Sequence, residues 1–146
     1  MKNLGELLAK SWLDKTFLNL DTLNAKDIPS TRKEAFEAQN FFYQSINKKT
    51  VGWKIGAVAK EVQEEEGYDG PVPGKIFEDT FLQINTNIDF NDIPHSNLEC
   101  EYALQFLKDS KIDNELDKDL NQIKLFTAID ITSTRYEQTS KDKFDK

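Results

Sequence analysis

Apolar positions at helical spacing predict two helices near the start of the chain. The first helix follows from four residues close to the N-terminus: Leu4, Leu7, Leu8 and Trp12. The second is predicted to begin after Pro29, where Thr31 and Glu34 form a capping box, and to end near Asn47. Its inward stripe is expected to comprise Ala35, Phe36, Gln39, Phe42, Tyr43 and Ile46. Residues 1–50 are therefore expected to be mainly helical.

Alternation of apolar and polar residues predicts strands in the rest of the chain. We expect strands at Val51–Gly56, Phe81–Ile84, Leu98–Phe106 and Leu125–Thr132. Short helices are predicted over Val58–Glu66 and in the charged segment 108–122. The second of these helices rests on the spacing of Leu116, Leu120 and Ile123. The glycine- and proline-rich segment Gly67–Gly74 is expected to be a shaped loop.

The strand Val51–Gly56 carries an unusual lysine. Gly52, Lys54 and Gly56 share one face, so the stem of Lys54 has no neighbouring side chain on its own strand. The lysine would then project into open space that a ligand could fill. The alternative is a surface lysine on an edge strand whose glycines form bulges.

Two carboxylates share one face of the strand Leu98–Phe106. Glu99 and Glu101 point to one side, at about 7 Å along the strand, while the opposite side is apolar and includes Cys100. Such a pair repels unless it is solvated or shares a cation, and the spacing suits a hard divalent metal ion. The alternative is a wet sheet face, which is the commoner environment of glutamate.

Asp130 is a third acid, set among apolar residues of the strand Leu125–Thr132. Burying an unpaired carboxylate is costly, so this acid needs a partner. Together with Glu99 and Glu101 it could form an all-oxygen set from two strands. Three carboxylates suit Mg²⁺ or Mn²⁺, and the sequence lacks the nitrogen and thiolate pattern of a zinc site.

Charge and cysteine content narrow the class of protein. The 146 residues include 26 acidic and 19 basic side chains, for a net charge of -7. This acidity disfavours nucleic acid and anionic membranes as partners. The lone Cys100 lies on an apolar face and is expected to be a buried thiol. No apolar stretch has the length of a signal peptide or membrane span, so we expect a soluble, cytoplasmic protein.

Four segments stand out together by their order and spacing: Ala35–Gln39, Val51–Gly56, Gly67–Gly74 and Glu99–Glu101. They resemble landmarks of the 2-keto-4-pentenoate hydratase family of the fumarylacetoacetate hydrolase superfamily. The resemblance implies an α+β fold, with N-terminal helices and a mixed sheet that forms part of a β-roll. The resemblance runs from the first helix to about Tyr136. We expect residues 1–146 to form a single domain, with the metal and substrate site in 51–136 and a polar tail at 137–146.

The resemblance also implies the roles of the candidate residues. Glu99, Glu101 and a later acid would bind Mg²⁺ or Mn²⁺, and Asp130 stands where the family usually has the longer glutamate. Lys54 would move a proton of a small 2-oxo acid substrate, and Gly74 would lie beside that substrate. The implied activity is a hydratase, a lyase that adds water to a 2-hydroxydienoate during the breakdown of aromatic compounds.

Two departures from the family keep other readings open. Pro73 stands where hydratases often carry an acid, which leaves a decarboxylase or C–C hydrolase of the same superfamily as the alternative. The family chain is about twice as long, so we expect this one to lack the C-terminal strands that close the roll. It could therefore be a truncated, inactive domain. We expect a homo-oligomer or a complementary C-terminal chain as partner.

Overall fold

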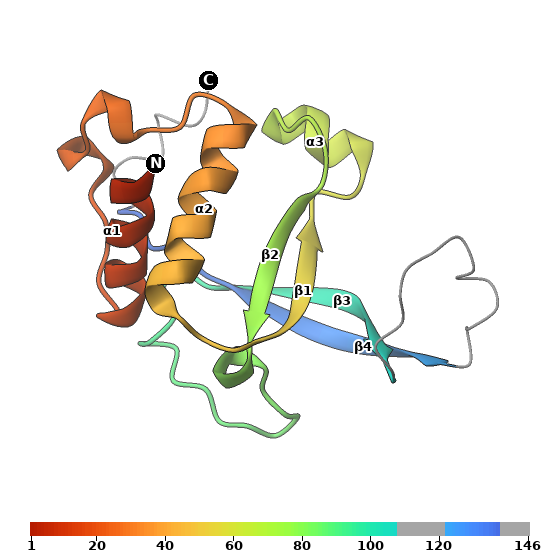
Figure 1. The fold of residues 1–146 in the computed structure, drawn as a ribbon. Helices are drawn as coiled ribbons and strands as arrows, with labels where there is room; N and C mark the ends of the chain where they lie inside the picture. The colour runs from red at the N-terminus through yellow and green to blue at the C-terminus, as the bar shows by residue number, and fades with distance from the viewer. Residues whose placement is uncertain (108–121, 138–146) are drawn as a thin grey trace. The chain divides into compact units, whose positions relative to one another are not determined.

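The computed structural model describes residues 1–107 and 122–137 and confirms the α+β class (Figure 1). The helices are α1 (Lys2–Leu13), α2 (Arg32–Ile46) and α3 (Lys60–Glu66). The strands are β1 (Thr50–Gly56), β2 (Val72–Phe77), β3 (Asn97–Phe106) and β4 (Ile123–Thr132). Short 3₁₀ turns occur at Leu20–Thr22, Ala25–Asp27 and Glu78–Thr80. The helix predicted in 108–122 lies outside the described residues, apart from Gln122. Ile123, whose spacing supported that prediction, begins β4.

The described strands pair in two antiparallel ladders, β1 with β2 and β3 with β4, where we expected one mixed sheet. The strand predicted at Phe81–Ile84 is wrong, because this segment is irregular in the structure. The last three residues of the predicted loop Gly67–Gly74 are instead the first half of β2. Contacts divide the described residues into two compact units, residues 1–88 with 135–137, and residues 89–107 with 122–134.

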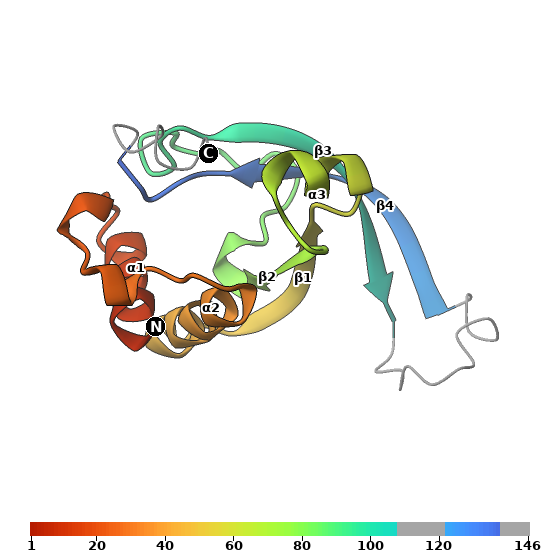
Figure 2. The same ribbon diagram turned by 90° about the horizontal axis from the view of Figure 1, so that it is seen from above.

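Helices α1 and α2 lie side by side, as Figures 1 and 2 both show, and they are closely packed at Gly5. A Cβ placed on Gly5 would lie 2.5 Å from the carbonyl oxygen of Ala38 and 2.5 Å from Cβ of Phe41. Both Gly5 and Ala38 are buried. The buried small residue of α2 is therefore Ala38, whereas Ala35 of the predicted stripe is exposed.

Gly5→Ala is expected to destabilise the protein, against the usual effect of this substitution. In an ordinary helix interior the change stabilises by about 1 kcal/mol. Here the added methyl group would push the helices apart, and overpacking of this kind costs about 1–3 kcal/mol. Urea denaturation gives the free energy of unfolding, with Glu6→Ala at the exposed neighbouring position as the control. A stability gain in Gly5→Ala would show that the helices are not closely packed.

The caps of α2 follow the sequence prediction in part. The Thr31 hydroxyl accepts a hydrogen bond from the Glu34 amide at 3.2 Å, which is the first half of the capping box. The Glu34 carboxylate accepts bonds from the amide and hydroxyl of Ser30, each at 2.8 Å, and these bonds lower the pKa of Glu34. Asn47 ends the helix in the left-handed conformation, at φ 45°.

An aromatic cluster joins both helices to β2. The ring of Trp12 packs edge-on against Phe42 and Phe77, with centroids 6.4 and 6.1 Å apart. Tyr43 packs against the same Phe77 at 6.0 Å. Burial raises the pKa of Tyr43. This cluster fixes one face of β2 against α2, which matters for the site described below.

Asp27 connects the 3₁₀ turn Ala25–Asp27 to helix α1. Its side chain is buried, and it accepts hydrogen bonds from Asn3 at 2.9 Å and from Asn24 at 3.4 Å. The bond from Asn3 is the main reason that the pKa of Asp27 lies below its usual 3.8, although burial works in the opposite direction.

We expect Asn3→Ala to flatten the acid limb of the stability curve. Because the folded pKa of Asp27 is lowered, its contribution is complete above the unfolded value of 3.8 and is lost as the pH falls below 3.8 through the folded pKa. Removing the Asn3 donor removes the largest cause of the lowered pKa of Asp27 and brings its folded pKa closer to the unfolded value. Thermal melts over an acid series measure the slope, and Asn24→Ala, which loses the longer bond, should change it less. An unchanged slope in Asn3→Ala would contradict this assignment.

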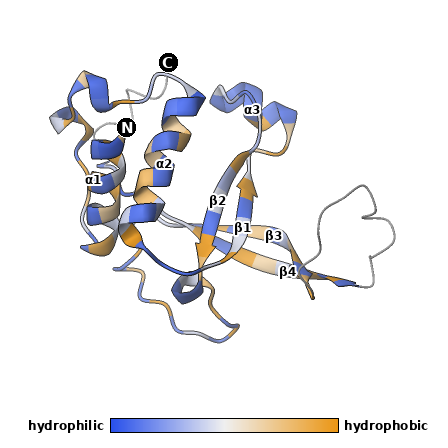
Figure 3. Ribbon diagram, in the orientation of Figure 1, coloured by the Kyte–Doolittle hydropathy of each residue, from blue (hydrophilic) through white to orange (hydrophobic). Residues whose placement is uncertain are grey.

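The apolar face of the β3–β4 ribbon is exposed to solvent, and Figure 3 shows hydrophobic positions along both strands. Tyr102 is 80% exposed, Ile129 68% and Leu98 63%. Cys100 is also exposed, so the prediction of a buried thiol is wrong. Its face is apolar as expected, but the described residues do not cover it.

Candidate active site

The register of the β3–β4 ribbon brings two of the predicted metal ligands together. Glu99 is paired directly with Asp130, and Glu101 is paired with Ala128 on the same face of the ribbon. Directly opposed residues have Cβ atoms about 4.5–5.5 Å apart. The sequence predicted that the two glutamates share a face, and the register adds that Asp130 lies on the same face.

The three carboxylates share a face but are not drawn together around one point. Within residues 1–107 and 122–137, no group of three or more His, Cys, Asp or Glu side chains is arranged to hold a metal ion. Glu99 and Glu101 are exposed, and Glu99 accepts a long hydrogen bond of 3.4 Å from the Thr132 hydroxyl. The donor set is entirely oxygen and suits Mg²⁺ or Mn²⁺ in kind. The assignment of these residues as metal ligands stays a prediction.

Lys54 lies in the other unit, on β1, in a position framed by glycines. Its partner across the ladder is Gly74, so a third glycine adds to Gly52 and Gly56 on its own strand. A Cβ on Gly74 would lie 3.3 Å from Cγ of Lys54 and 3.8 Å from its Cδ. The stem of Lys54 therefore occupies space that a side chain at Gly74 would fill. The roles of Lys54 in proton transfer and of Gly74 in substrate binding stay predictions.

Sequence reasoning missed the side chains that hold β2. Helix α2 directs Arg32, Gln39 and Tyr43 to backbone groups before and along this strand. One signal was available, because the inward stripe predicted for α2 included the polar Gln39. A polar residue on an inward face needs a hydrogen-bond partner, and a neighbouring backbone is the commonest one.

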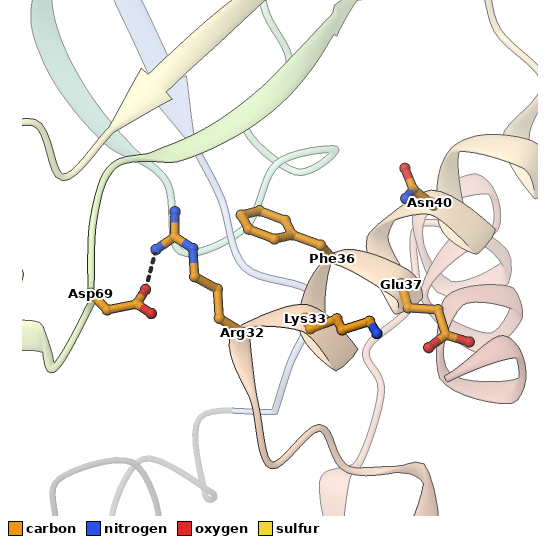
Figure 4. Close-up of a pocket in the computed structure, with 6 residues that line it drawn as sticks. All are labelled: Arg32, Lys33, Phe36, Glu37, Asn40 and Asp69. Atoms are coloured by element: carbon orange, nitrogen blue, oxygen red, sulfur yellow. Dashed lines mark hydrogen bonds and ion pairs between the residues drawn. The ribbon is translucent and has the colours of Figure 1, made fainter.

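An open hollow of about 690 Å³ lies beside this contact (Figure 4). It is lined by Arg32, Lys33, Phe36, Glu37, Asn40 and Asp69. Figure 4 shows Arg32 extending to Asp69, at 2.8 Å, and its guanidinium lies 4.9 Å from the centroid of the Phe36 ring. The predicted site residues do not line this hollow, and its charges are mixed in sign. We assign it no ligand.

Comparison with known proteins shows the fold. No protein-family model and no curated protein matches the sequence. A solved structure does match: 4-oxalocrotonate decarboxylase from Pseudomonas putida G7, complexed with magnesium and adipate. The TM-score is 0.74 at 19% sequence identity, over 93% of this chain and 53% of that chain. The chain thus has the fold of about half of that enzyme.

Among the described residues, no helix combines the length and the apolar character that crossing a membrane requires.

Proposed function

We propose that this chain is part of a metal-dependent enzyme of the fumarylacetoacetate hydrolase superfamily that acts on small 2-oxo acids. The observation that carries the proposal is the register that sets Glu99 opposite Asp130, with Glu101 on the same face. The likeness in fold to a magnesium-bound 4-oxalocrotonate decarboxylase supports it. The sequence resemblance of Val51–Gly56 and Glu99–Glu101 to hydratase motifs supports it independently.

The chemistry follows from the residue types. A divalent cation held by the carboxylates would supply a Lewis acid for the ketone and carboxylate oxygens of the substrate. Lys54 would remove a proton from the carbon next to the ketone, or return one to it, as a general base or acid. Gly74 leaves the room that the Lys54 stem needs beside β2. Hydration, decarboxylation and C–C cleavage of 2-oxo acids can share this proton transfer.

Two reactions compete within this proposal. The sequence motifs favour a hydratase, which adds water to a 2-hydroxydienoate. The fold match and Pro73, which replaces an acid common in hydratases, favour a decarboxylase or C–C hydrolase. The loss of diene absorbance reports hydration, whereas release of carbon dioxide reports decarboxylation.

Proton exchange tests what these reactions share. In D₂O with Mg²⁺ or Mn²⁺, we expect the protein to accelerate deuterium incorporation at C3 of a 2-oxo acid, followed by NMR.

Calorimetric titration with Mn²⁺ tests the metal site without turnover. Equal Mn²⁺ affinity in the wild type and Glu101→Ala would contradict the ligand assignment, and Gln105→Ala on the same strand face is the control.

We also propose that the enzyme acts in an assembly, either as a homo-oligomer or with a complementary C-terminal chain. The exposed apolar face of the ribbon supports this proposal, since large exposed apolar areas often mark interfaces. The chain also spans only about half of the enzyme whose fold it shares. Light scattering of the purified chain distinguishes a self-associating protein from one that needs another chain.

A further inference from the structure

Two side chains of α2 hydrogen-bond to the backbone of β2. Gln39 Nε2 donates to the carbonyl oxygen of Pro73 at 3.0 Å, and the hydroxyl oxygen of Tyr43 accepts from the amide of Lys75 at 3.0 Å. Proline has no amide hydrogen, so at Pro73 the carbonyl is the only backbone group that needs a partner. These contacts occupy a strand edge that would otherwise present bare polar groups.

A third side chain of α2 holds the loop that leads into β2. Arg32 Nη1 donates to the carbonyl oxygen of Gly70 at 2.9 Å and to Asp69 at 2.8 Å, and Nη2 donates to the carbonyl oxygen of Pro71. Figure 4 shows the side chain of Arg32 directed towards Asp69. The planar fork of an arginine suits several acceptors at once.

The spacing of these residues on the helix matches the spacing of their partners on the strand. Arg32, Gln39 and Tyr43 are seven and four residues apart, which places them on one helix face. Pro73 and Lys75, the partners of Gln39 and Tyr43, alternate along β2, and Pro71, a partner of Arg32, directly precedes the strand. The rise from 39 to 43 is about 6 Å on the helix, close to about 6.6 Å for two strand residues. The longer step from 32 to 39 is taken up by the long arginine side chain.

These contacts bracket the glycine that lies beside Lys54. Gly74 stands between the two bonded residues 73 and 75 and is paired with Lys54 across the ladder. A shift of β2 by one residue would replace this glycine with Pro73 or Lys75, and the stem of Lys54 would lose its space. A Cβ at position 74 would lie only 3.3 Å from Cγ of Lys54, so the space beside Lys54 tolerates little displacement of β2.

We propose that Arg32, Gln39 and Tyr43 are positioning residues, which hold β2 in register so that Gly74 stays beside Lys54 and the amine of Lys54 keeps one orientation. The inference rests on the proposed function for the catalytic meaning of Lys54. The positioning itself concerns only this chain's contacts, and it can be measured without metal or substrate.

The experiment compares Gln39→Leu and Tyr43→Phe with Gln44→Leu and Tyr68→Phe, matched changes at exposed positions. Tyr43→Phe keeps the ring in the aromatic cluster, so the fold is retained. We expect the Lys75 amide to exchange about fivefold faster in Tyr43→Phe, the effect of losing one ordinary hydrogen bond.

Competitive acetylation read by mass spectrometry gives the reactivity of Lys54 relative to exposed Lys60 over a pH series. This ratio should change by about twofold or more in both test variants.

An unchanged acetylation profile of Lys54 in both test variants would overturn the inference, even if the Lys75 amide exchanged faster, because α2 would then only stabilise the strand. A change of the same size in Gln44→Leu or Tyr68→Phe would overturn it as well. Failure of the proposed function has a different signature: turnover would survive replacement of Lys54, whatever the acetylation profile.

Discussion

Lys54→Met is expected to slow deuterium incorporation at C3 of a 2-oxo acid by about 10²–10⁴-fold, the usual contribution of a general acid or base. Methionine keeps the length and apolar stem of lysine but carries no titratable group. The methionine side chain can therefore still lie beside Gly74. That space is narrow, since a Cβ built on Gly74 would lie 3.3 Å from Cγ of Lys54. NMR of the substrate in D₂O, in the assembly that shows activity, measures the rate.

The same variant should leave Mn²⁺ binding nearly unchanged, because the predicted ligands lie on β3 and β4. Lys60→Met, at the exposed start of α3, is the matched control and should exchange protons at the wild-type rate. Retention of most of the rate in Lys54→Met would remove Lys54 from the mechanism. A parallel loss of Mn²⁺ affinity would indicate that the substitution disturbed the fold instead.

The strands of the candidate metal site could be predicted because their pattern is local. The period-two alternation from Leu98 onward predicted β3 to within one residue of its observed start at Asn97. The same alternation placed Glu99 and Glu101 on one face. It could not give the pairing of Glu99 with Asp130, because register depends on contacts between segments far apart in sequence.

Strand β2 was missed because its local signals favour a loop. Gly70, Pro71, Pro73 and Gly74 all weaken a strand prediction. Pro73 is tolerated because it lies at an edge of the ladder, where a side chain of α2 replaces a neighbouring strand. Gln39 donates the hydrogen bond that the carbonyl of Pro73 would otherwise receive from such a strand. The hydrogen-bond donor, Gln39, is 34 residues away from Pro73 in the sequence, so no local pattern around β2 could indicate it.

The error at Cys100 has a similar origin. Alternation correctly assigns a residue to a strand face, but it does not say whether that face is covered. The face of Cys100 is apolar, and its neighbours Leu98 and Tyr102 are 63% and 80% exposed. The described residues do not cover this face, so its residues are both apolar and exposed.

Glu99→Gln is expected to affect the β3–β4 ribbon in opposite directions without and with metal. In EDTA the variant should be more stable by up to about 1 kcal/mol, because Glu99 and Asp130 are like charges directly opposed across the ladder. Glutamine keeps an oxygen that can accept the Thr132 hydroxyl. Amide hydrogen exchange of β3 and β4 measures the free energy of opening the ribbon.

With Mn²⁺ at about 100 times the wild-type Kd, binding should stabilise the wild-type ribbon by about 2.7 kcal/mol. Glu99→Gln should gain much less, since a neutral amide replaces a charged ligand, so the order of stability reverses on adding metal. Glu101→Gln helps to separate the two effects. Glu101 faces Ala128 and lies about 7 Å along the strand from Glu99, so this variant should gain less stability in EDTA than Glu99→Gln and still lose the gain with Mn²⁺. A ribbon that Mn²⁺ protects equally in all three proteins would exclude these carboxylates as the metal site. Reversal in Glu99→Gln alone would restrict the site to Glu99 and Asp130.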